Sequence, residues 1–133
     1  MSMKKSLLLV VAVIVMVTAF QLMTSGGNAM LIDMSDTAIS FSGIDDFREE
    51  IPYSEIASAE LLAVQDWSSY QGHEFGQFRV RSMGEGEHYG LFVTTQADCV
   101  VALSLSDGRQ MFFNYNNVSD TQAIYNLLLE NVQ

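Results

Sequence analysis

The sequence predicts a mainly β domain of about seven antiparallel strands, folded into a partly closed barrel that a C-terminal α-helix caps. Three observations predict it. From residue 30 onward, short apolar runs alternate with turn-forming residues. The end of the chain changes to a helical period, and its beginning holds one long apolar run. A chain of 133 residues suits one domain. We therefore expect residues 1–29 to be a membrane segment with its linker and residues 30–133 to be the domain.

The N-terminal apolar run follows Lys4 and Lys5 and extends over residues 6–20 almost without a polar side chain. Residues 7–23 reach the lower limit of about 17 residues for a membrane-spanning helix. We therefore expect an N-terminal apolar helix that anchors the chain in the cell membrane as a single-pass protein. The lysine pair stays on the cytoplasmic side, which places the domain outside the cytoplasm.

A cleaved signal peptide is the alternative interpretation of the same run. Gly27 and Ala29 have the spacing of the small residues that precede a signal-peptide cleavage site. In that case the domain is secreted. The sequence leaves both interpretations open, and both place the domain outside the cytoplasm.

The domain is strongly acidic. After residue 30 the chain has four arginines and no lysine against sixteen acidic residues, which gives a net charge of −12. Such a charge repels phosphate backbones and anionic lipid headgroups. We therefore expect no nucleic-acid partner, and we expect the membrane to be reached only through the N-terminal helix.

Alternating apolar residues place the strands in order along the chain. The expected strands are residues 29–34, 37–42, 62–64, 77–82, 88–95, 99–106 and 109–115. Ser35 and Asp36 indicate a hairpin between the first two strands. Asp107-Gly108 indicates a hairpin between the last two and is the strongest such signal in the chain. Cys99 lies on the apolar face of its strand and is expected to be a buried small hydrophobe.

Two segments between these strands are expected to be irregular. Residues 43–50 (GIDDFREE) are expected to form a charged loop, and residues 53–57 a helical turn. The neighbouring carboxylates of Asp45 and Asp46, and those of Glu49 and Glu50, lie in a single polar loop and are interpreted as a solvated face rather than as groups for acid–base catalysis.

The C-terminal segment predicts an amphipathic helix of about 12 residues, a usual length. Ser119 and Gln122 have the spacing of a capping box, which predicts the start of the helix. Apolar residues then recur on one side at helical spacing: Ile124, Leu127, Leu128 and Val132. We expect this side to cover the apolar surface of the sheet.

Five segments together resemble the bacterial pleckstrin-homology-like (bacterial PH) domain family of small membrane-anchored proteins. They are DMSDTAISFSG, IPYSEIASAEL, GEHYGLFVT, VVALSLSDGRQMFFN and SDTQAIYNLLLE, and the resemblance covers residues 31–131. It implies a PH-like barrel of seven strands in two sheets with a C-terminal helix, no enzymatic activity, and capture of an extended peptide beside that helix. The first hairpin, MSDT, has no basic residue where phosphoinositide-binding relatives hold the headgroup, so phosphoinositide binding is not expected.

The glycine-rich stretch RSMGEGEHYGLF, residues 81–92, is the part of the chain that looks most like a chemical site. Its glycines lack the spacing of a dinucleotide-binding loop and lead into a strand, so we expect no cofactor. Glu85, Glu87 and His88 are weak candidates for metal ligands. The favoured interpretation is a solvated hairpin tip in which glycines supply positive φ angles.

The aromatic loop, residues 66–76 (DWSSYQGHEFG), is the candidate partner-binding surface. It holds the single tryptophan, Trp67, together with Tyr70 and Phe75 in a polar setting, a composition enriched at protein recognition surfaces. The alternative is that Trp67 folds back over the core as a lid.

These observations predict a non-catalytic, membrane-tethered or exported PH-like binding module whose partner is a protein or peptide. With two histidines and one cysteine, the sequence offers no nucleophile arrangement, so we expect no enzyme. The alternative is a small exported enzyme or metal-dependent accessory factor that uses the tip formed by Glu85, Glu87 and His88.

Overall fold

The computed structural model describes residues 24–25, 28–84 and 86–132. The predicted N-terminal apolar helix lies outside these residues. In the described ranges, no helix has the length and hydropathy that crossing a bilayer requires. Just before the domain, β1 (Thr24–Ser25) and β2 (Asn28–Ala29) form a short antiparallel pair.

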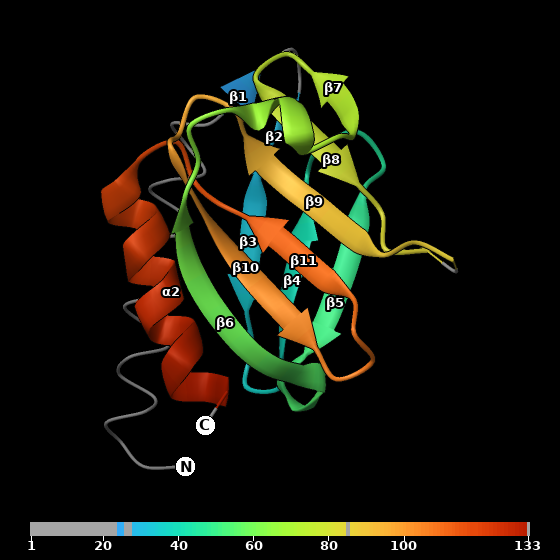
Figure 1. Cartoon of the computed structure of the whole chain (residues 1–133), viewed down its shortest axis with the longest axis vertical. Coiled ribbons are helices and arrows are strands. Elements are labelled where there is room, and N and C mark those ends of the chain that lie inside the picture. Colours follow the sequence, from blue (N-terminus) through green and yellow to red (C-terminus); the bar gives the residue numbers. More distant parts are fainter. Residues whose placement is uncertain (1–23, 26–27, 85, 133) are drawn as a thin grey trace.

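The domain is mainly β, as predicted, and consists of two sheets that lie one behind the other with one helix along their side (Figure 1). The smaller sheet has the order β3-β4-β5 and is antiparallel: β3 is Leu31–Met34, β4 Ala38–Ser42 and β5 Arg48–Pro52. The larger sheet has the order β6-β10-β11-β9-β8-β7. Its strands are β6 (Ile56–Ala63), β7 (His73–Phe75), β8 (Phe78–Arg81), β9 (Tyr89–Thr94), β10 (Cys99–Leu105) and β11 (Gln110–Phe113).

Both predicted hairpins are confirmed. In the first, the Ser35 hydroxyl accepts hydrogen bonds from the backbone N–H groups of Thr37 (3.2 Å) and Ala38 (3.1 Å), so the turn between β3 and β4 is held by its own serine. In the second, Gly108 has a φ of 93°, which a residue with a side chain adopts only at a cost. At both turns, the turn-forming residues in the sequence were therefore sufficient to predict the hairpin.

The expectation of a charged loop over residues 43–50 is partly wrong. Its second half, from Arg48, belongs to β5 and pairs with β4. The strand was missed because three of its five residues are charged and only Ile51 among them is buried. The expected helical turn is a short 3-10 helix, Tyr53–Glu55, which leads directly into β6.

The expectation of a uniformly antiparallel, partly closed barrel is also wrong. The β10–β11 hairpin places β11 between β9 and β10, so β11 is antiparallel to β10 and parallel to β9. In addition, no pair of strands in the described residues joins the smaller sheet to the larger one. Residues 95–98, which connect β9 to β10, must cross the end of β11, and a hairpin between the two flanking strands is thereby excluded. The fold is a pair of packed sheets rather than a closed barrel.

The predicted C-terminal helix is confirmed as α2 (Val118–Val132), but it begins earlier than expected. Asn117 rather than Ser119 is the N-cap: its side-chain Oδ1 accepts a hydrogen bond from the Asp120 N–H at 2.8 Å, and its Nδ2 donates to the Asp120 carboxylate at 3.0 Å. The capping-box spacing from Ser119 was misleading because an asparagine two residues earlier makes the bond.

The apolar side of α2 covers the core, as the helical spacing predicts. Ile124 and Leu128 are fully buried, while Leu127 and Val132 contact the core from its margin. The helix lies along the edge strand β6 (Figure 1), where the Tyr125 hydroxyl donates a hydrogen bond to the Ala59 carbonyl at 3.4 Å.

Two apolar clusters lie on the two faces of the larger sheet. The main core lies between the sheets and contains Phe41, whose ring is 5.4 Å from that of Phe92 and 5.2 Å from that of Phe113. The second cluster contains Leu91 and Val93, the neighbours of Phe92 on β9. Since successive strand residues point to opposite faces, the second cluster lies on the face turned away from the smaller sheet.

Candidate functional site

The aromatic loop folds back onto the outer face of the larger sheet. Trp67 begins a 3-10 turn, and its indole Nε1 donates a hydrogen bond to the Ala97 carbonyl at 2.8 Å. The ring of Tyr70 lies 5.1 Å from that of Trp67 and 5.4 Å from that of Phe112. Trp67 and Tyr70 thus cover the second cluster, and both rings stay partly exposed.

Arg79 on β8 fastens this loop to the sheet. Its Nη1 donates to the backbone carbonyls of Trp67 (2.7 Å) and Tyr70 (2.9 Å), and its Nη2 forms an ion pair with Glu74 at 2.9 Å. A guanidinium that binds two carbonyls fixes both ends of the turn. The aromatic loop is therefore held in place without a partner, as expected for a lid, while a contact role for its exposed ring edges stays a prediction.

Phe75, the third candidate of the aromatic loop, lies apart from the other two. It belongs to β7 and packs at the margin of the main core. The three candidate residues of the loop thus divide between two places, and only Phe75 lies at the cavity described below.

The candidate metal ligands of the glycine-rich stretch are placed as follows. Glu85 lies outside the described residues. The Glu87 carboxylate forms an ion pair with Arg81, whose guanidinium also lies 4.5 Å from the centre of the Tyr89 ring. His88 is exposed. Within the part of the chain that the structure describes, no three His, Cys, Asp or Glu side chains are grouped so that they could hold a metal ion. Gly86, with a φ of 86°, forms the turn as expected of a glycine.

A cavity of about 430 Å³ opens between the two sheets. One wall is the segment that leads into β5, and the other is formed by β7, β8 and the residue after β8. The residues that line it are Ile44, Asp45, Asp46, Phe47, Arg48, His73, Phe75, Val80 and Ser82. A second cavity of about 550 Å³ shares His73 and Ser82 with the first but is lined by no residue of the segment that leads into β5, so only the first cavity lies between the sheets. We call the first cavity the intersheet groove.

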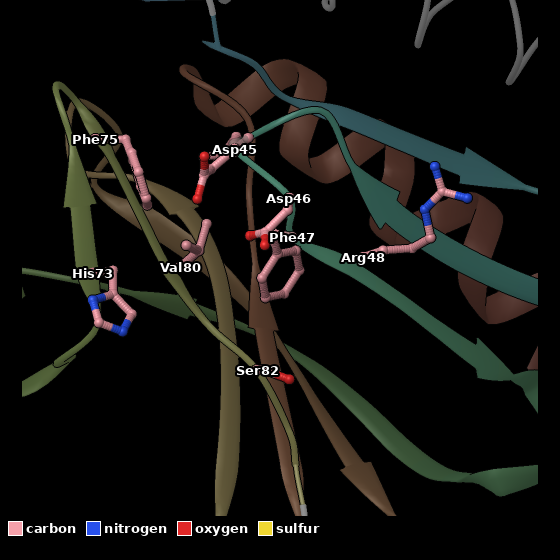
Figure 2. Close-up of a pocket in the computed structure, with 9 residues that line it drawn as sticks. Asp45, Asp46, Phe47, Arg48, His73, Phe75, Val80 and Ser82 are labelled. Atoms are coloured by element: carbon pink, nitrogen blue, oxygen red, sulfur yellow. The ribbon is translucent and has the colours of Figure 1, made fainter.

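Figure 2 shows how side chains are directed at the intersheet groove. The carboxylates of Asp45 and Asp46 point toward the wall that carries Phe75 and Val80. The Phe47 ring lies below them and stacks on Phe92 of the core at 5.3 Å. The groove thus has an apolar, aromatic floor and a mouth with two carboxylates.

Glu49 of β5 spans the gap between the sheets at the end of the cavity. Its Oε1 accepts hydrogen bonds from the Ser82 hydroxyl at 2.7 Å and from the Met83 N–H at 2.8 Å. In a closed barrel, backbone hydrogen bonds between strands would join the two sheets, whereas here the Glu49 side chain joins them. Glu49 therefore links the two sheets beside the cavity, next to the lining residue Ser82.

Sequence reasoning placed Asp45 and Asp46 in a solvated loop and did not identify the groove. The only local signal was Phe47, an aromatic residue within a charged segment. The opposite wall comes from residues about thirty positions later, so no local pattern could join the two.

No protein-family model matches the sequence, and no curated protein matches it.

Proposed function

We propose that this chain is a non-catalytic binding module that holds a segment of a protein or peptide in the intersheet groove. The observation that carries the proposal is the cavity of about 430 Å³, in which the Phe47 ring lies below the two aspartates and Phe75 belongs to the opposite wall. Its volume accommodates one or two large side chains, and recognition sites of this kind combine apolar walls with a few polar groups.

The edge of β5 supports an extended conformation of the bound segment. In the described residues, β5 pairs with β4 and with no strand on its other side, where the groove begins. An unpaired edge can accept a further strand through backbone hydrogen bonds, while an adjacent pocket takes one of its side chains. The groove and the edge together thus suit a peptide better than a compact ligand.

We retain the PH-like kinship and the membrane tether within the same proposal. Two packed sheets with a C-terminal helix support the kinship, whereas the parallel β9–β11 pair departs from the expected antiparallel order. The apolar run after Lys4 and Lys5 supports a tether with the domain outside the cytoplasm.

Selection from a random-peptide phage library on the full chain in detergent micelles tests the proposal. A plug variant, His73→Trp, places an indole at the cavity wall, and Gln122→Trp on the exposed side of α2 is its matched control. We expect selected peptides to bind the parent and the control equally and the plug variant at least about tenfold more weakly. Failure to enrich any peptide, or enriched peptides that ignore the plug in a variant with the parental melting temperature, would contradict the proposal.

A further inference from the structure

We propose that the segment bound in the intersheet groove is cationic: it inserts an arginine or lysine between the carboxylates of Asp45 and Asp46 and the aromatic floor. This inference rests on the proposed function and specifies the chemistry of its partner. Three features of the groove support it: the charges around it, the backbone turn that carries the two carboxylates, and the aromatic surface beside them.

The first feature is the distribution of charge. Three arginines of the domain are already engaged with carboxylates: Arg79 with Glu74, Arg81 with Glu87, and Arg109 with Asp107. The remaining arginine, Arg48, lines the groove, but Figure 2 shows that its side chain extends away from the cavity. The domain therefore places no guanidinium of its own in the cavity mouth, among the residues that the structure describes.

The second feature is that the backbone of Asp45 and Asp46 is held in a turn while their carboxylates have no cationic partner among the described residues. The Asp45 backbone has a φ of 51°, and its N–H donates to the Asn28 side-chain Oδ1. The Phe47 N–H closes the turn on the Ile44 carbonyl at 3.0 Å. Both side chains are exposed, and no ion pair in the described residues includes either carboxylate. Two neighbouring anions at a cavity mouth attract a cation and repel an anion.

The third feature is the aromatic surface. The aliphatic stem of arginine or lysine packs on apolar surface while its charged head stays at the polar rim. The rings of Phe47 and Phe75 offer such a surface, and a guanidinium over an aromatic ring gains further attraction. A cationic side chain can thus pack its stem on the aromatic rings and pair its charge with the carboxylates at the mouth. An acidic side chain and a purely apolar one each lack the charge for the second interaction.

A peptide accounts for these features better than a second copy of the domain. The domain has no lysine, and three of its four arginines are paired, so a copy has little free cation to offer. The unpaired edge of β5 beside the cavity also favours an extended chain. The occupant is therefore an extended segment in which a basic residue adjoins apolar ones.

Fluorescence anisotropy with the full chain in detergent micelles tests the inference. The probe is a fluorescein-labelled octapeptide of alternating arginine and leucine, and its match carries citrulline at each arginine, which keeps the shape and removes the charge. The variant Asp45→Asn/Asp46→Asn removes two charges at the groove. Asp36→Asn/Asp98→Asn removes two exposed charges elsewhere and is the control. We expect the groove variant to weaken arginine-peptide binding at least about tenfold and the control less than about twofold.

Each other outcome contradicts a specific part of the proposal: the cationic pocket, the peptide occupant or the proposed function itself. Equal binding of the citrulline peptide, or equal loss in both double variants, excludes the cationic pocket. Displacement of the probe by free arginine amide at the concentration that unlabelled peptide needs indicates a small-amine site and excludes the peptide. If the phage library enriches neutral peptides that the His73→Trp plug blocks, the proposed function stands and this inference is wrong. If it enriches none, both are wrong.

Discussion

Asn114 does with one side chain what a strand residue does with its backbone. It follows the last residue of β11 and is fully buried. Its Oδ1 accepts from the Thr94 N–H at 2.8 Å, and its Nδ2 donates to the carbonyls of Thr94 (3.1 Å) and Cys99 (3.0 Å). Those backbone groups belong to β9 and β10, the strands on either side of β11. The amide therefore completes the sheet where β11 ends.

Asn114→Ala is expected to lower the free energy of unfolding by roughly 3 kcal/mol or more, because it leaves three buried backbone groups without partners at about 1–3 kcal/mol each. Urea denaturation measures the loss. Asn126→Ala on the exposed side of α2 is the control and should stay within about 0.5 kcal/mol of the parent. Equal stability of both variants would show that water replaces the amide.

Two buried tyrosines predict opposite responses to loss of the hydroxyl. The Tyr53 hydroxyl donates to the Ser35 carbonyl at 2.8 Å, whereas the buried Tyr115 hydroxyl has no partner among the described residues. Tyr53→Phe should cost about 1 kcal/mol, and Tyr115→Phe should be neutral or stabilising. Denaturation of both variants in urea gives the sign. Destabilisation by Tyr115→Phe would reveal a partner for its hydroxyl.

The same tyrosines set the alkaline limit of stability. Burial, with the negative charges of Asp33 and Asp36, raises the pKa of Tyr53 to about 12, and burial also raises the pKa of Tyr115. The folded state thus holds these protons more tightly than the unfolded state, whose tyrosine pKa is about 10. Their contribution to stability is fully present below about pH 10 and is lost as pH rises toward 12. Melting temperatures from pH 9 to 12 should fall less steeply for Tyr53→Phe than for the parent.

At the scale of elements, the aromatic loop and the groove should separate in function. Trp67→Ala removes a ring that covers the second cluster and a hydrogen bond to Ala97, so it should cost roughly 2 kcal/mol or more. Ser69→Ala, exposed in the same turn, is the control. Unchanged melting of Trp67→Ala together with weaker capture of library peptides would instead show that Trp67 is a contact residue and that the groove is not the whole site.

The start of α2 gives a matched pair of substitutions. Asn117→Ala removes the bond to the Asp120 N–H and should cost about 1 kcal/mol, whereas Ser119→Ala should change stability by less than about 0.5 kcal/mol. Thermal melts of both variants distinguish the two caps. The reverse order of effects would restore the start of the helix that its sequence spacing predicts.

At the scale of the whole molecule, charge governs encounters with surfaces. A fragment of residues 24–133 keeps the net charge of −12 and omits the apolar run. It should not sediment with phosphatidylserine vesicles at physiological salt, because like charges repel and no basic patch compensates. Zwitterionic phosphatidylcholine vesicles are the control. Binding to the anionic vesicles that salt weakens would contradict this expectation.

What could be predicted from the sequence follows the range of the interactions involved. The hairpins at Ser35 and Gly108 and the apolar side of α2 depend on residues close in the chain, and all three were predicted. The position of β11 depends on pairing with β9, twenty-one positions earlier, and the strand pattern contains no sign of it. The groove is of the same kind: Asp45 and Val80 line one cavity although they lie far apart in the sequence, so the acidic segment was interpreted as solvated. The prediction of the N-cap was wrong for a local reason, because the two candidates, Asn117 and Ser119, lie only two residues apart.

The place of β11 between β9 and β10 also has a kinetic consequence. Only residues 95–98 separate these two flanking strands, a length that suits a hairpin, so β9 and β10 can pair directly in a collapsing chain. That pairing fills the position of β11 and must dissociate before the native sheet can form. If the β10–β11 hairpin closes first, within microseconds, it can dock on β9 as a unit, and the native sheet forms without this detour. We therefore expect that a weaker turn at Asp107 and Gly108 slows the assembly of the sheet as well as lowering its stability.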